Sequence, residues 1–329
     1  MPFSQPSRSD VHVDGPLTSV SLAYIQNADA FVADRAFPRI GVAKQSDKYF
    51  TYDRGYFNRA EMEKRAPAAE SAGANYAIST DSYGCDVWAL HRDVADQVRA
   101  NADSPISLDR EATELLSLQA LLRKEKEWAT NFFVTGKWTT ERAGVGATPT
   151  GTQYLQWDDA ASTPIEDIRA GVRAVHTLTG FRPNRMVAGR AVYDALLDHP
   201  DIVGRLDRGQ TSGPAIVMRD ALAALFEMDE ILVMDAIENT AGEGLTNVHA
   251  FIGGKNAVLL YTPPSPGLMI PSAGYTFSWT GLLGGGALGS RISRMRMEHL
   301  KADRIEIEMA FAQKQVAADL GAFFLDAVA

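Results

Sequence analysis

The glycines at 284–289 come closest, of all residues in this sequence, to a motif with known chemistry. They fit the dinucleotide-binding pattern G-x-G-x-x-G, which requires a strand before the glycines and a helix opening after them to meet the pyrophosphate. Here the run, Gly284–Gly289, lies near the C-terminus and is followed at 290–294 by a strand pattern. We interpret it as a flexible turn between strands. A nucleotide-dependent enzyme using this loop is retained as the alternative from another functional class.

Other side chains capable of chemistry are scattered along the chain. No two of the six histidines lie at metal-ligand spacing, and none accompanies the single cysteine, so the sequence predicts no zinc site. Cys85 lies beside Tyr83 and Trp88, and we interpret it as a packing residue. There is no G-x-S-x-G motif and no Walker lysine. We therefore expect no enzymatic activity, no bound metal and no cofactor.

One basic cluster near the C-terminus is suited to contact nucleic acid. It consists of Arg291, Arg294 and Arg296, interleaved with Ile292 and Met295. This spacing is typical of the solvent face of a strand. Two uses remain open for the arginines, contact with DNA and ion pairs between subunits, and we favour the ion pairs.

The overall composition limits the class of protein further. Forty-one acidic against 32 basic residues give a net charge of -9, which argues against a protein that coats nucleic acid by neutralising it. An acidic wall around DNA would, however, avoid sticking to it. No stretch approaches the roughly 18 apolar residues of a membrane span, and the N-terminus lacks a secretory signal. A single cysteine fits a reducing cytoplasm.

The N-terminal quarter of the chain is predicted to be extended. Residues 1–46 have few apolar clusters, apart from a partial helical pattern at 20–37, and should form an arm lying on another surface. The pattern over residues 47–92 predicts a long two-stranded hairpin. Near Ser82 the apolar residues change from even to odd positions, which suggests a bend or bulge. A ribbon of two strands is marginal in water, so it needs a partner surface. Charges of both signs gather at its tip: Arg54, Arg59, Glu61, Glu63, Lys64, Arg65 and Glu70.

A long helix is predicted to follow, capped by Asp109 and running to about Thr135. Leucines including Leu115, Leu118 and Leu122 recur at helical spacing, and the helix would be roughly 40 Å long. The mixed charges at 123–127 predict that these residues form the solvent-exposed face of the helix.

The remaining sequence predicts a mixed α+β architecture. Helix and strand patterns alternate over 161–262, which indicates an α/β subdomain. Its first helix should open with a capping box at Thr163 and Glu166, with Pro164 at the first helical position. In the last stretch, 263–329, apolar residues at 305, 307, 309 and 311 alternate with other residues as in an antiparallel strand.

The order of these parts, and several local phrases, resemble the major capsid proteins of tailed bacteriophages, which share the Hong Kong ninety-seven phage fold. The phrases are ADRAFPRIGVAKQSDKYFTYDRG at 33–55, KRAPAAESAGANY at 64–76, SYGCDVWALHRDVADQVRANAD at 82–103 and LDREATELLSLQALLRKEKEWATNFFVTG at 108–136. The resemblance implies five parts. These are an N-terminal arm (1–46), an E-loop (47–92), a P-domain with its spine helix (93–160), an A-domain (161–262) and return strands belonging mainly to the P-domain (263–329).

The resemblance also implies a function and its partners. The chain would self-assemble as pentamers and hexamers into an icosahedral shell around double-stranded DNA, in the virion, after synthesis in the cytoplasm of a bacterial host. Its partners would be copies of itself, a separate scaffolding protein, a portal, a further decoration protein and non-specifically held DNA. The E-loop would lie over a neighbouring subunit, with its charged residues setting the register. An encapsulin-type nanocompartment, which shares the fold but stores cargo enzymes, is the alternative within this fold.

Overall fold

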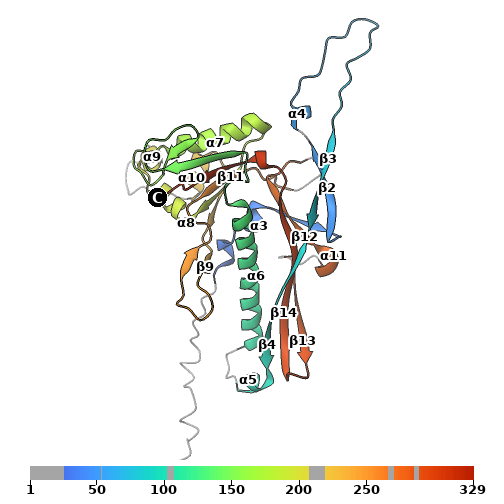
Figure 1. Cartoon of the computed structure of the whole chain (residues 1–329), viewed down its shortest axis with the longest axis vertical. Coiled ribbons are helices and arrows are strands. Elements are labelled where there is room, and N and C mark those ends of the chain that lie inside the picture. The colour runs from blue at the N-terminus through green and yellow to red at the C-terminus, as the bar shows by residue number, and fades with distance from the viewer. Residues whose placement is uncertain (1–25, 53, 102–106, 207–218, 266–269, 285–288) are drawn as a thin grey trace, which may run out of the picture.

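The computed structural model describes residues 26–52, 54–101, 107–206, 219–265, 270–284 and 289–329. A compact α/β part lies on one side of the molecule, and a long helix runs away from it beside a mainly antiparallel sheet (Figure 1). A two-stranded ribbon projects beyond both (Figure 1). The predicted α+β class is confirmed. No helix within the described ranges is long and apolar enough to span a membrane.

The compact part is built on a six-stranded sheet with the order β6-β5-β15-β11-β7-β8. Its strands are β5 (Thr140–Val145), β6 (Gln153–Leu155), β7 (Arg185–Gly189), β8 (Glu230–Met234), β11 (Ala257–Leu260) and β15 (Gly321–Leu325). The strand from the end of the chain, β15, lies between β5 and β11. The C-terminal residues therefore complete the sheet of this part. The resemblance described above implied that the return strands of 263–329 belong mainly to the P-domain.

Four helices accompany this sheet: α7 (Pro164–Thr179), α8 (Arg190–Asp198), α9 (Pro200–Leu206) and α10 (Arg219–Leu225). Helix α7 has Pro164 in its first turn, as predicted, and ends at Gly180 with a φ of 79°. The predicted capping box is wrong, because the side chain of Thr163 makes no capping hydrogen bond. Apolar side chains of α7, such as Ile165 and Ile168, are fully buried in the core between helices and sheet.

The long helix is α6 (Leu108–Phe132), with Ser107 rather than the predicted Asp109 at the N-cap position. It packs against β14 through a buried cluster that includes Ala112 and Leu116. Leu115, predicted to belong to the apolar stripe, is 40% exposed. The apolar stripe at this end of the helix is therefore displaced by one residue from the predicted one.

A second sheet lies beside α6. It has the order β1-β12-β14-β13, with β4 also paired to β14. Its strands are β1 (Arg39–Val42), β4 (Asp86–Ala95), β12 (Gly274–Trp279), β13 (Ser290–Met297) and β14 (Ala302–Gln315). The predicted alternation in β14 is confirmed, because Ile305, Ile307, Met309 and Phe311 are all buried in the cluster beneath α6.

The ribbon consists of β2 (Ser46–Tyr52) and β3 (Ile78–Gly84), paired in antiparallel register. The predicted hairpin over 47–92 was too long, because the chain leaves the ribbon at Cys85 and continues as β4, which pairs with β14. The break falls at Cys85, three residues after the expected bend. Shorter elements are η1 (Ala28–Ala30), α3 (Ala33–Ala36), α4 (Arg54–Phe57), α5 (Asp96–Ala100), β9 (Ile237–Asn239), β10 (His249–Phe251), α11 (Thr280–Leu283) and η3 (Ala318–Leu320).

The N-terminal arm is described from residue 26 onward. The partial helical pattern predicted at 20–37 appears there as η1 and the single turn α3, which ends before Pro38; residues 20–25 lie outside the described part. Helix α3 contacts α6, and its buried Ala33 and Ala36 join a core cluster with Trp128 of that helix. The arm therefore lies on the spine helix, and β1 then pairs with β12.

Candidate assembly surfaces

The ribbon carries an exposed apolar face. Phe50 is 58% exposed, and Ile78, which is registered opposite Tyr52 on the same face, is 51% exposed. The rings of Tyr52, Phe57 and Tyr76 lie 5.7–6.1 Å apart in a small aromatic cluster. Apolar surface gathered on an element without a core of its own marks a site of protein contact. This face is therefore suited to pack against another molecule.

Beyond this face lies the tip of the ribbon, where every residue from 62 to 75 is exposed and Met62 is 99% exposed. Of the charged residues predicted as contacts, Arg54 forms an ion pair with Asp319 near the base, and Arg59 pairs with Glu61. The guanidinium group of Arg65 donates to the backbone carbonyl of Ala69. Three further members of the predicted set are exposed and form no ion pair within the described chain: Glu63, Lys64 and Glu70. Arg54 is thus tied to its own chain, and the rest of the set is presented outward.

The predicted arginine cluster is divided between the two faces of β13. Arg294 and Arg296 point toward the face that α6 covers, since their partners Ile305 and Asp303 lie there. Arg291 has the opposite parity, and its guanidinium group binds Glu308 at 2.6 Å. The structure therefore brings two of the three predicted residues together and separates the third.

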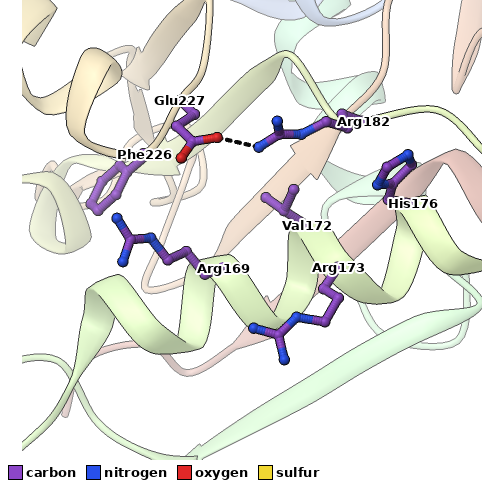
Figure 2. Close-up of a pocket in the computed structure, with 7 residues that line it drawn as sticks. All are labelled: Arg169, Val172, Arg173, His176, Arg182, Phe226 and Glu227. Atoms are coloured by element: carbon purple, nitrogen blue, oxygen red, sulfur yellow. Dashed lines mark hydrogen bonds and ion pairs between the residues drawn. The ribbon is translucent and has the colours of Figure 1, made fainter.

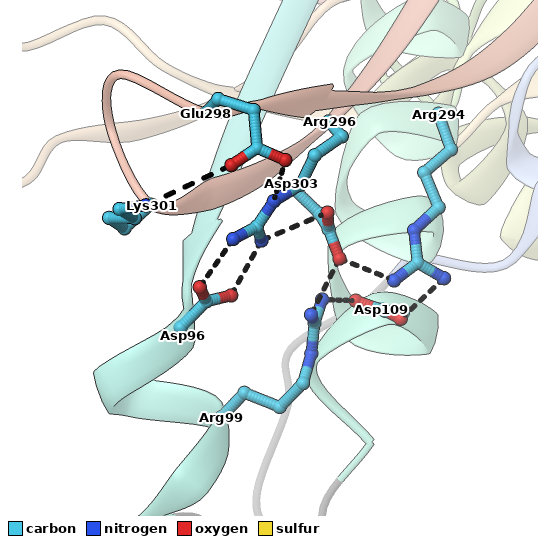
Figure 3. Close-up of polar contacts among 8 residues, drawn as sticks. All are labelled: Asp96, Arg99, Asp109, Arg294, Arg296, Glu298, Lys301 and Asp303. Carbon is cyan, nitrogen blue, oxygen red and sulfur yellow. Dashed lines mark hydrogen bonds and ion pairs between the residues drawn. The ribbon is translucent and has the colours of Figure 1, made fainter.

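Arg294 and Arg296 belong to an ion network centred on Asp303 (Figure 3). The carboxylate of Asp303 accepts from Arg294 at 2.5 Å, from Arg99 at 2.6 Å and from Arg296 at 3.3 Å. These hydrogen bonds hold the pKa of Asp303 far below its usual value. The other members are Asp96, Asp109, Glu298 and Lys301. Four cations face four carboxylates of the same chain, so the network is neutral and intramolecular. Because Arg294 and Arg296 are already paired, they are less available for either predicted role, contact with DNA or ion pairs between subunits.

A second buried ion site was missed by the sequence interpretation. The run 123–127 was expected to be solvated, yet Lys124 and Glu125 are buried. The Nζ of Lys124 lies 3.0 Å from Asp34 of α3. The Oε2 of Glu125 accepts from the backbone N–H groups of Val32 and Ala33, at 2.9 and 2.8 Å. Burial raises the pKa of Glu125 to about 7, although the two hydrogen bonds act in the opposite direction.

Glu125 caps α3 from another element. The N-cap residue of α3 is Val32, whose side chain has no hydrogen-bonding atom, so the first N–H groups of this turn need an external acceptor. The signal that could have found Glu125 is its spacing, because it stands four residues after Leu121 and three before Trp128, on the apolar stripe of α6. Because Glu125 is a charged residue, the sequence pattern assigned it to the solvated face of the helix despite its position on the apolar stripe.

A Ser162–His199 contact in the α/β part is the arrangement closest to a nucleophile and its base. The Oγ of Ser162 lies 3.0 Å from Nε2 of His199. However, Nδ1 of His199 accepts a hydrogen bond from the N–H of Asp201, which leaves Nε2 of the neutral ring as a donor. A donor cannot take the serine proton. We interpret His199 as a buried residue that caps α9.

The remaining sequence candidates for chemistry are structural as well. The glycine run begins after the short helix α11 and leads into strand β13, opposite to the strand-then-helix order of a dinucleotide site; residues 285–288 lie outside the described part. Cys85 is buried, and burial raises the pKa of its thiol to about 11, which disfavours the reactive thiolate. Among the described residues, no group of three or more histidine, cysteine or acidic side chains could hold a metal ion.

The chain is similar in sequence to known phage proteins. Residues 150–266 match the family model described as Phage major capsid protein E. The major capsid protein of Pseudomonas phage JBD67 is 28% identical over 98% of this chain and 99% of its own length. That of Burkholderia phage BcepMu is 26% identical over 94% of both chains.

Solved structures show the same fold. A phage-related protein from Bordetella bronchiseptica superposes with a TM-score of 0.67 at 20% identity, covering 92% of this chain and 94% of that one. The capsid of cyanophage P-SCSP1u gives 0.61 at 9% identity, over 98% and 95%. The SrpI encapsulin of Synechococcus elongatus gives 0.55 at 12% identity, over 97% of each chain.

The chain therefore has the fold that phage capsids and an encapsulin share, the Hong Kong ninety-seven fold. The similarity to two phage major capsid proteins along nearly the whole chain favours a phage capsid protein over an encapsulin. The predicted resemblance to the major capsid proteins of tailed phages is confirmed.

Proposed function

We propose that copies of this chain assemble as pentamers and hexamers into an icosahedral shell around packaged double-stranded DNA, with each ribbon lying over a neighbouring copy. The observation that carries the proposal is the exposed apolar face of the ribbon, formed by Phe50, Phe57, Tyr76 and Ile78 without cover from the described chain. A neighbouring subunit would bury this face, and many such contacts around a ring would give the shell its stability.

The proposal assigns DNA a passive role. The chain is acidic, and all three arginines considered for DNA contact pair with carboxylates of the same chain. Contacts with DNA would accordingly be few and independent of sequence. The proposal includes a scaffolding protein, a portal and a decoration protein as partners, assembly in the host cytoplasm, and no catalytic activity.

Deleting Asn58–Gly73, the outer part of the ribbon, tests the proposal. These residues are exposed or nearly so and contribute little to the core, so the variant should remain a folded, soluble subunit. We expect it to form no stable shells, as judged by electron microscopy beside the intact chain. Intact particles formed by the deletion variant would overturn the role of the ribbon.

An encapsulin-type compartment is the second candidate, because the SrpI encapsulin shares the fold over nearly the whole chain. The sequence similarity favours a phage capsid. The contents of particles produced with their native partners distinguish the two. Nuclease-protected DNA is expected for a capsid, and a stoichiometric cargo enzyme for a compartment.

A further inference from the structure

A shallow hollow of about 260 Å³ lies beside α7, next to the turn that joins α10 to β8 (Figure 2). Val172 and Phe226, both almost fully buried, form its apolar floor. Polar side chains surround this floor: Arg169, Arg173, His176, Arg182 and Glu227. The hollow therefore combines a small apolar surface with a polar and mainly cationic rim.

The rim of the hollow carries three arginines and one glutamate, so positive charge is in excess there. Arg182 pairs with Glu227, whereas Arg169 and Arg173 form no ion pair with any residue that the structure describes. They stand one turn apart on α7, where like charges destabilise a helix. The helix dipole favours cations only in the last turn, which reaches His176 but not these arginines. In a chain with a net charge of -9, this local excess of arginine suits an acidic partner.

A matching surface occurs at the tip of the β9–β10 hairpin. All residues from 242 to 251 are exposed, and Leu245 is 71% exposed. Glu243 lies two residues before Leu245 and forms no ion pair within the described chain. The loop is nevertheless well defined, because Asn239 Oδ1 accepts from the N–H of Val248 at 2.9 Å. An exposed apolar side chain and an exposed carboxylate thus lie two residues apart at the tip of the hairpin.

The two surfaces lie on opposite sides of the α/β part (Figure 1). Helix α7 is on the side from which the ribbon projects, and the hairpin extends from the α/β part in the opposite direction (Figure 1). A head-to-tail ring requires two different, complementary surfaces placed in this way.

We propose that the hairpin tip of one copy docks in the α7 hollow of the next copy in the ring. Leu245 would cover Val172 and Phe226, and Glu243 would pair with Arg173. The inference rests on the proposed function, because it needs neighbouring copies in a ring. It adds a second contact between them, separate from the ribbon.

Charge reversal at the two positions tests this contact. Arg173→Glu and Glu243→Arg each place like charges opposite one another, which is strongly unfavourable at an interface. We expect each single variant to lower the yield of sedimenting particles roughly tenfold or more. The double variant Arg173→Glu/Glu243→Arg restores the pair and should recover most of that yield. Circular dichroism and thermal unfolding of the unassembled subunits check that every variant is folded.

A matched control separates pairing from net charge. Arg173→Glu combined with Glu111→Arg has the same net charge as the restoring double variant, but Glu111 is exposed in the first turn of α6, at the end far from the α/β part, and forms no ion pair among the described residues, so no recovery is expected. The inference is overturned if the single variants assemble normally, or if the restoring variant does no better than the singles or the control. If the unaltered chain forms no particles at all, the proposed function fails instead.

Discussion

At the scale of single residues, Glu125 connects the N-terminal arm to the spine helix. Its carboxylate supplies the acceptor that the first turn of α3 cannot provide for itself, and Lys124 beside it holds Asp34 of the same turn. The arm therefore depends on two adjacent ionisable residues of α6. Removing one partner of such a buried arrangement is costly, because the other is left without compensation.

Glu125 should make the stability of the subunit depend on pH. Its pKa is 4.5 in an unperturbed chain and about 7 in the fold, so between these values the folded state holds a proton that the unfolded state releases. The free energy of unfolding should consequently fall as the pH rises from about 4.5 to about 7, by at most about 3 kcal/mol. Urea unfolding of unassembled subunits at several pH values measures this slope. Glu125→Gln accepts the same hydrogen bonds without a charge and should flatten it; an unchanged slope in this variant contradicts the assignment.

Removing the acceptor altogether should release the arm. In Glu125→Ala the N–H groups of Val32 and Ala33 lose their partner, which should destabilise the subunit by about 1–3 kcal/mol. Hydrogen exchange localises the effect: both amides should lose protection in the alanine variant and retain it in Glu125→Gln. Equal protection in the two variants would show that the capping interaction does not hold α3.

At the scale of elements, the ribbon was predictable in kind but not in length. The sequence pattern predicts two strand-like runs, at 48–57 and 75–90, yet it does not say which strand each one pairs with. The change of partner occurs at Cys85, where the chain leaves β2 and β4 meets β14, more than 200 residues later in sequence. Such non-local pairing is invisible to a local pattern. The same reason explains why β15 was not assigned to the sheet of the α/β part.

The aromatic face of the ribbon should matter for assembly and hardly at all for folding. Phe57 and Tyr76 are about half exposed and contact mainly each other and Tyr52. Replacing both by serine should leave the thermal unfolding of the subunit within a degree or two of the original, since exposed side chains away from the core usually change stability by about 0.5 kcal/mol or less. Particle formation should be lost, as seen by sedimentation. A variant that assembles normally would show that this face is not buried between subunits.

At the scale of the whole molecule, the order of the parts was predictable and the polar contacts were not. The long helix, the α/β part and the buried alternation of β14 follow from periodicity, and the resemblance to phage capsid proteins rests on the sequence of these parts. In contrast, the arginines of β13 could not be assigned, because their carboxylate partners come from α5, α6 and β14. Ion networks of this kind depend on tertiary structure and have no spacing of their own.

The central claim is that the ribbon of one copy lies over another copy in a closed shell. Electron cryomicroscopy of the particles formed by the intact chain tests it most directly. We predict closed shells in which Phe50, Phe57, Tyr76 and Ile78 are buried against a neighbouring subunit. Shells whose ribbons remain exposed to solvent, or a chain that stays a monomer or a small oligomer with its scaffolding partner present, would contradict the claim.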